Sequence, residues 1–251
     1  MTNTMTRPTR WLSVAGVGIL AAWTLSSCGG GPPALTEISD SAQQSMEEAT
    51  SFTYTVSDPD GVHGEEIEAG EFSGQTDQVN FNITVTTPDA DIEIRAVDES
   101  TSFLKLSFSD ESLRDLLGGA ETEGQWIAVP SSEQEDLSEF TDDFDGINET
   151  TFSLIDGLSE EELDTVEVEE IELDGQDVYK YVVPATADNN SDLYTGAETV
   201  AFYFLKESSE LVQVDASTGD STATHAFTDF NQVELFEAPA DDEIAELDWA
   251  F

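Results

Sequence analysis

Six consecutive apolar residues, Val200-Ala201-Phe202-Tyr203-Phe204-Leu205, decide how this chain folds. Successive side chains of a β-strand point to opposite faces of the sheet, so a strand without a polar position is covered on both faces. One face would be covered by helices or a ligand, and the other by the rest of the fold. We therefore predict a fully buried strand at 200–205.

Shorter alternating runs flank this strand on both sides and predict an antiparallel meander of roughly ten strands in one domain. The turn signal Asp174-Gly175 predicts a hairpin into the strand at 178–183. The other runs lie at 52–56, 79–85, 92–96, 104–108, 126–129, 166–168, 171–173, 211–214, 223–227 and 233–236.

Helices account for the rest of the pattern. Apolar residues recur at intervals of three and four from Leu35 to Ala49, which predicts an amphipathic helix at 36–49. Between about 110 and 163 the strand pattern loosens, and we predict a helical insertion that packs on the sheet. The fold class is therefore α+β.

Charge excludes one class of function. The chain has 55 acidic and 7 basic residues, and two of the basic ones, Arg7 and Arg10, lie near its start. The remainder after residue 27 keeps five basic against 55 acidic residues, a formal charge of −50. Such a surface repels nucleic acids, whereas high salt would screen its self-repulsion, so we expect a saline habitat and no nucleic-acid partner.

The first 28 residues have the pattern of an export signal. A basic start precedes an apolar stretch from Trp11 to about Leu25, which is shorter than a membrane-spanning helix. Leu25-Ser26-Ser27-Cys28 is similar to the bacterial lipobox, which implies lipidation of Cys28 and cleavage before it. Cys28 is the one cysteine of the chain, so no disulfide can form within a single chain. We expect the protein to be a monomer. We predict a signal peptide at 1–27, a lipidated cysteine and flexible tether at 28–34, a domain at 35–245 and a tail at 246–251.

The order of these elements resembles the LppX/LprG-type lipoproteins of actinobacteria, which share the half-barrel of the LolA-type lipoprotein carriers. The resemblance rests on residues 49–54, 173–181 and 202–212, and above all on 227–244, with Ala238-Pro239 after a closing strand. It implies a curved antiparallel sheet whose concave face, capped by helices, holds acyl chains. It also implies a lipid or glycolipid ligand and a location on the outer face of the cell membrane.

Eight apolar residues are candidates for the lining of such a cavity, and the same residues could simply fill a core. They are Phe81, Ile83, Val85, Ile94, Leu106, Tyr181, Phe202 and Phe204. Burial of each methylene of an acyl chain beside them would contribute about 0.8 kcal/mol.

Motifs of catalysis and of cofactor binding do not stand out in the sequence. We find no nucleophile elbow, phosphate loop or Cys/His cluster, and His63 and His225 read as isolated strand residues. The acidic run 142–149 fails the spacing of an EF-hand, although a looser cation site stays open. We expect no enzyme, cofactor or metal, and a lipid-binding lipoprotein is the leading hypothesis. The rival is a surface adaptor or sensor that binds a protein or cations through its acidic exterior.

Overall fold

The computed structural model describes residues 31–62, 67–109, 122, 124–130, 147–185, 194 and 196–245, with the backbone alone at 148 and 149. The chain divides into residues 1–31 and the unit Pro32–Phe251, and the fold described here belongs to the second unit. None of the helices in these described residues is long and apolar enough to cross a bilayer.

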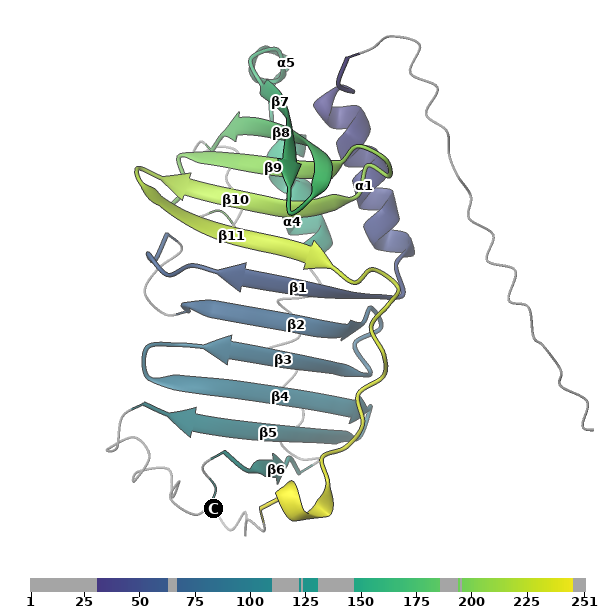
Figure 1. The fold of residues 1–251 in the computed structure, drawn as a ribbon, viewed down its shortest axis with the longest axis vertical. Coiled ribbons are helices and arrows are strands. Elements are labelled where there is room, and N and C mark those ends of the chain that lie inside the picture. Colours follow the sequence, from purple (N-terminus) through teal and green to yellow (C-terminus); the bar gives the residue numbers. More distant parts are fainter. Residues whose placement is uncertain are drawn as a thin grey trace, which may run out of the picture. The chain divides into compact units, whose positions relative to one another are not determined.

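Among the described residues, eleven antiparallel strands form one open, curled sheet (Figure 1). The predicted α+β class with a curved antiparallel sheet is confirmed, with one strand more than the rough count from the sequence. The strands are β1 (Ser51–Ser57), β2 (Ala69–Gln75), β3 (Phe81–Thr86), β4 (Ala90–Asp98), β5 (Thr101–Phe108), β6 (Trp126–Ala128), β7 (Glu167–Leu173), β8 (Gln176–Pro184), β9 (Thr199–Leu205), β10 (Leu211–Thr218) and β11 (Ser221–Thr228).

The sheet joins two meanders at one long-range pairing. Its strand order is β6-β5-β4-β3-β2-β1-β11-β10-β9-β8-β7, so neighbours in sequence pair within each half. The halves meet where β1 pairs with β11, for example at Tyr54 and Phe227. β1 and β11, the first and last of the described strands, therefore lie side by side in the middle of the sheet (Figure 1).

Alternation along each strand assigns its side chains to one of two faces. We call one the helical face, because its side chains share a core with the helices α1 (Leu35–Glu48) and α4 (Ile147–Asp156). The opposite, outer face carries a smaller apolar cluster around Val178, Ala201 and Tyr203. β9 contributes to both clusters, so the strand predicted to be covered on both sides is found as predicted.

Two rows of side chains cross the helical face at right angles to the strands. The deep row is mostly buried and consists of Phe227, Tyr54, Phe72, Ile83, Ile94, Leu104 and Ile127. The shallow row begins at the buried His225 and continues through the half-buried Val56, Gly70, Val85, Ile92 and Leu106.

The helices follow their apolar spacing. In α1 the buried residues Leu35, Ile38, Ala42 and Met46 recur every three or four positions, and the helix ends before Ala49, which is extended. The predicted helix at 36–49 is thus found one residue earlier at each end. The short helix α5 (Glu160–Leu163) begins with a capping box between Ser159 and Glu162.

One strand of the helical face was missed by the sequence analysis. β2 has a single large apolar side chain, Phe72, which is 1% exposed and lies between Gly70 and Gly74 on the same face. Two glycines hide the alternation of period two that predicts a strand. At Gly74 the structure needs a glycine, since an added Cβ would lie 2.5 Å from Cβ of Phe81.

The predicted strand at 233–236 is wrong, because its backbone bonds to side chains. We call residues 231–245 the C-terminal strap, which passes the ends of β1 to β6 toward the short 3₁₀ helix η2 (Asp241–Glu243) (Figure 1). The amide of Asn80 accepts a hydrogen bond from N of Phe236 at 2.8 Å and donates one to its carbonyl at 3.0 Å. Gln75 donates to the carbonyl of Val233. These amides replace the neighbouring strand that a ladder would require.

Candidate functional site on the helical face

All eight predicted lining residues lie on the helical face, but the structure divides them by burial. Six are buried in the core: Phe81, Ile83, Ile94, Tyr181, Phe202 and Phe204. The other two, Val85 and Leu106, are half-buried members of the shallow row. The eight positions therefore do not form one uniform lining.

The buried aromatic residues already have protein partners. The rings of Phe202 and Phe204 stack with centroids 6.3 Å apart, and Tyr181 meets Phe204 edge-on at 5.8 Å. Tyr194 meets Phe202 in the same way at 6.1 Å. Offset and edge-to-face pairs at such distances are favourable core contacts. These buried rings contact one another, so they are less available for contact with a ligand than the half-buried residues are.

The shallow row is the apolar surface that is left for a ligand. Four of its side chains, Val56, Val85, Ile92 and Leu106, are half-buried, and the first three pack against the core. From His225 to Leu106 the row crosses five strand spacings, which amounts to about 24 Å. Gly70 has no side chain, so the row has a shallow depression at this position, which we call the step. A Cβ added there would lie 3.0 Å from Cγ1 of Val56.

A group of polar side chains lies at the β11 end of this row. We call Tyr54, His225, Tyr194 and Thr151 the polar island, and all four residues are buried. The hydroxyl of Tyr54 and Nδ1 of His225 share a hydrogen bond of 2.7 Å, and the tautomer of the imidazole decides which atom donates. The hydroxyl of Tyr194 donates to the carbonyl of Thr151 at 3.0 Å. Burial raises the pKa of Tyr54 and of Tyr194 well above the usual value, so both phenols are neutral at ordinary pH.

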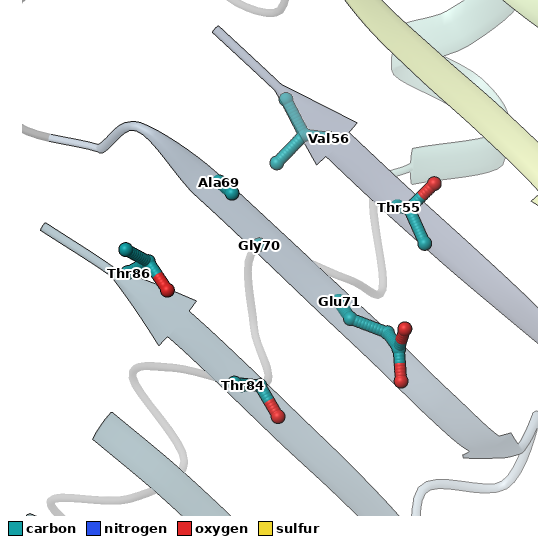
Figure 2. Close-up of a pocket in the computed structure, with 7 residues that line it drawn as sticks. All are labelled: Thr55, Val56, Ala69, Gly70, Glu71, Thr84 and Thr86. Carbon is teal, nitrogen blue, oxygen red and sulfur yellow. The ribbon is translucent and has the colours of Figure 1, made fainter. Parts of the chain in front are cut away.

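The outer face has a separate hollow of about 310 Å³ over β1, β2 and β3 (Figure 2). Its lining residues are Thr55, Val56, Ala69, Gly70, Glu71, Thr84 and Thr86. Five of them, all except Val56 and Gly70, have side chains opposite to Tyr54, Phe72 and Ile83 and therefore point to the outer face. The hollow exists because Ala69 and Gly70 are small. Its wall includes three threonine side chains and the side chain of Glu71.

Four described basic side chains lie away from the shallow row. Arg95 and Lys105 lie over the indole of Trp126 on the outer face, at 4.5 Å and 5.4 Å from the ring centroid. Lys180 lies over the ring of Tyr203, also on the outer face. Lys206 pairs with Glu170 at 2.7 Å. The helical face therefore offers an acyl ligand apolar side chains and neutral polar groups.

Comparison with known proteins identifies the fold. No protein-family model and no curated protein matches the sequence. Among solved structures, LprF from Mycobacterium bovis superimposes with a TM-score of 0.53 at 11% identity, over 84% of this chain and 100% of LprF. The chain has the LprF fold.

Two other structures are similar over a comparable length. The lipoprotein LppX from Mycobacterium tuberculosis is 16% identical, with a TM-score of 0.48 over 81% of this chain and 100% of LppX. The LolA superfamily protein NE2245 from Nitrosomonas europaea is 8% identical, with a TM-score of 0.26 over 83% of this chain and 96% of NE2245. The superposition on LprF confirms, at the level of the fold, the resemblance stated from the sequence.

Within the LprF fold, the polar island was not predicted from the sequence. His225 was predicted to be an ordinary strand residue, and Thr151 and Tyr194 were not predicted as site residues. The one available signal was a polar residue in an apolar alternation, since Ala223, His225 and Phe227 share a face of β11. The partner of His225 lies 171 residues away at Tyr54, and local spacing does not report such a pair.

Several other sequence-based sites lie outside the described residues. Cys28 and His63 are among them, as is most of the acidic run 142–149. Within the described ranges, no group of three or more His, Cys, Asp or Glu side chains could hold a metal ion. The described residues begin within the expected tether at 28–34, and Tyr181 donates a hydrogen bond of 2.7 Å to the carbonyl of Pro33 in that tether. Burial raises the pKa of Tyr181 to about 12, so this donor stays protonated.

Proposed function

We propose that this chain is a non-enzymatic lipoprotein that holds an acyl-bearing lipid on the helical face of its sheet. The shallow row is the observation that carries this proposal. It offers a continuous, half-buried apolar surface from β1 to β5 that a core without a ligand function would be expected to cover.

The proposal also draws on the sequence and on the fold. The leader at 1–27 and Cys28 would attach the domain 35–245 to the outer face of the cell membrane through the tether 28–34. The LprF fold and the resemblance to lipid-binding lipoproteins of actinobacteria point in the same direction. The bound lipid would then be shielded from water close to the membrane.

Lipid binding is tested by native mass spectrometry of the mature protein purified from its own host in molar salt. The informative variant is Val85→Asp, which puts a carboxylate into the shallow row. Thr84→Asp is the matched control, because the neighbouring side chain on the same strand points to the outer face.

We expect a co-purifying lipid on the wild type and on Thr84→Asp, and its loss from folded Val85→Asp, since a carboxylate beside an acyl chain is poorly solvated. Repeated absence of lipid from the wild type would contradict the proposal and favour the adaptor or sensor function.

The anchor is tested separately. We expect the wild type to partition into detergent and to gain the mass of a diacylglyceryl group at residue 28, whereas Cys28→Ser remains unprocessed or soluble. An unmodified Cys28 in the native host would exclude anchoring without excluding lipid binding.

A further inference from the structure

The hollow on the outer face lies on the side of the sheet opposite to the shallow row, so the proposed lipid does not occupy it. Its volume of about 310 Å³ is large enough for a small organic molecule, since ligand pockets in proteins measure about 300 to 1,000 Å³. The side chains that line the hollow therefore decide which class of molecule it can bind.

Glu71 on β2 is the charged member of the seven lining residues. Its carboxylate has no hydrogen bond or ion pair with another residue in the described ranges. Arg95 and Lys105, the described basic residues on this half of the outer face, both pair with Glu93 instead, at 3.3 Å and 3.5 Å. The negative charge of Glu71 is therefore left for a ligand.

Hydroxyl groups flank this carboxylate on both sides. Thr55 of β1 and Thr84 of β3 are each paired in register with Glu71, and Figure 2 shows their side chains on the two strands beside it. Cβ atoms of directly opposed residues lie about 4.5 to 5.5 Å apart, so one ligand group can reach all three side chains. The hydroxyl of Thr86 already donates a hydrogen bond to Asp91 at 2.9 Å and keeps its lone pairs as acceptors. The wall thus presents a row of oxygen acceptors around one negative charge.

The chemistry of this wall selects among small ligands. An anion would be repelled by Glu71, and a quaternary ammonium ion is typically bound by aromatic rings, which are absent from the seven lining residues. A calcium ion takes six to eight oxygen ligands, usually with several carboxylates, whereas these residues supply one. A primary ammonium group donates three hydrogen bonds and matches one carboxylate flanked by hydroxyls. The methyl groups of Ala69 and of the threonines can contact a short hydrocarbon body.

We propose that the hollow binds a short alkylammonium ion, whose N–H groups donate hydrogen bonds to the carboxylate of Glu71 and to the hydroxyls of Thr55 and Thr84. The site goes beyond the proposed lipid-binding function, because it lies on the opposite face and uses other side chains. It gives the protein a second ligand of different character, which is small, cationic and water-soluble.

Salt separates this site from the general attraction of cations to an acidic surface. In about 1 M KCl the Debye length is about 3 Å, so distant charges are screened and direct contacts persist. The isotope-labelled mature protein is titrated in this salt with butylammonium while its backbone amide chemical shifts are recorded. The comparison probes are tetramethylammonium, which lacks N–H donors, n-butanol, which lacks a charge, and butyrate, whose charge is negative.

Three variants locate the binding. Glu71→Gln keeps the shape of the side chain and removes its charge, and Ala69→Leu fills the hollow. Glu169→Gln is the matched control, because it removes the same charge from the outer face of β7. Six strand spacings separate β7 from β2, which amounts to about 29 Å along the sheet.

We expect butylammonium to shift the amide signals of Gly70, Glu71 and Thr84 in a saturable way, and the other three probes to leave them unchanged. Glu71→Gln should weaken the binding of butylammonium about tenfold, the effect of one hydrogen bond to a charged group. Glu169→Gln should keep the wild-type affinity, and Ala69→Leu should abolish the response. The dispersion of each spectrum verifies that the variant is folded.

Several outcomes would overturn the inference. They are equal affinity of Glu71→Gln and wild type, an equally strong response to tetramethylammonium, and shifts that spread over the acidic surface without saturation. A wild-type protein that does not respond to butylammonium would contradict it as well. None of these results bears on lipid binding, which Val85→Asp tests on the other face of the sheet.

Discussion

The step at Gly70 makes the shallow row easy to block without touching the core. A Cβ at this position would lie 3.0 Å from Cγ1 of Val56 and 3.7 Å from the carbonyl of Thr84. Gly70→Leu should therefore project its side chain across the row after a small shift of Val56. The crowding of Val56 opposes a gain from replacing glycine within a strand, so we expect a change of at most about 1.5 kcal/mol in the free energy of unfolding.

The effect of Gly70→Leu on lipid binding follows from the length of row that it cuts off. Between Gly70 and Leu106 lie three strand spacings, about 14 Å. Loss of only about four buried methylenes from this part costs about 3 kcal/mol, at about 0.8 kcal/mol each. The dissociation constant should rise roughly 100-fold.

Competition with a fluorescent fatty-acyl probe measures this change in molar salt. Ala69→Leu is the control, because its side chain points into the hollow of the outer face and should leave binding unchanged. A folded Gly70→Leu protein that binds the probe as tightly as the wild type would refute the placement of the acyl chain along the shallow row.

Three further predictions concern the strap, the alkaline limit and salt. Asn80→Ala removes two hydrogen bonds to Phe236 and one to the carbonyl of Val97, so urea unfolding should show a loss of about 3 kcal/mol at an unchanged slope. A loss below about 0.5 kcal/mol, which is typical of surface substitutions, would mean that the strap adds little to stability. Burial raises the pKa of Tyr181 from its usual value of 10.0 to about 12, so the unfolded chain loses this proton first and stability should fall as pH rises from about 10 to 12. Tyr181→Phe should make that fall less steep, and an identical pH profile would show that other groups control it. Glu167→Lys on the acidic strand β7 should raise the melting temperature at about 0.1 M salt, where the Debye length is about 10 Å. The same substitution should have little effect at about 1 M salt, where the Debye length is about 3 Å. An equal shift of the melting temperature at both salt concentrations would contradict a screened charge effect.

The strongest local patterns predicted the fold best. Val200 to Leu205 and the helix from Leu35 are recognisable because their apolar spacing matches one type of element over its whole length. β2 was missed because Gly70 and Gly74 replace two of its three core-facing side chains. The strap was read as a strand because Val233 and Phe236 look apolar and extended, whereas their backbone partners are the side chains of Gln75 and Asn80.

The candidate site depends more on tertiary structure. The sequence indicated which residues are apolar and share the face of Phe81 and Ile83, but burial separates Val85 and Leu106 from the other six. This difference depends on where α1 and α4 pack, which no strand encodes by itself. The polar island joins β1, β11, α4 and Tyr194, so it exists only after distant segments have met.

The junction of β1 and β11 governs when this molecule can become native. Tyr54 pairs with Phe227, which lies 173 positions later, so every residue between them must be synthesised before the two strands can pair. At a synthesis rate of about 5 to 20 residues per second, this interval lasts roughly 10 to 30 s, and during it one edge of β1 is unpaired. A newly made chain thus stays incompletely folded throughout this interval, and the pairing of β1 with β11 is a late step of folding.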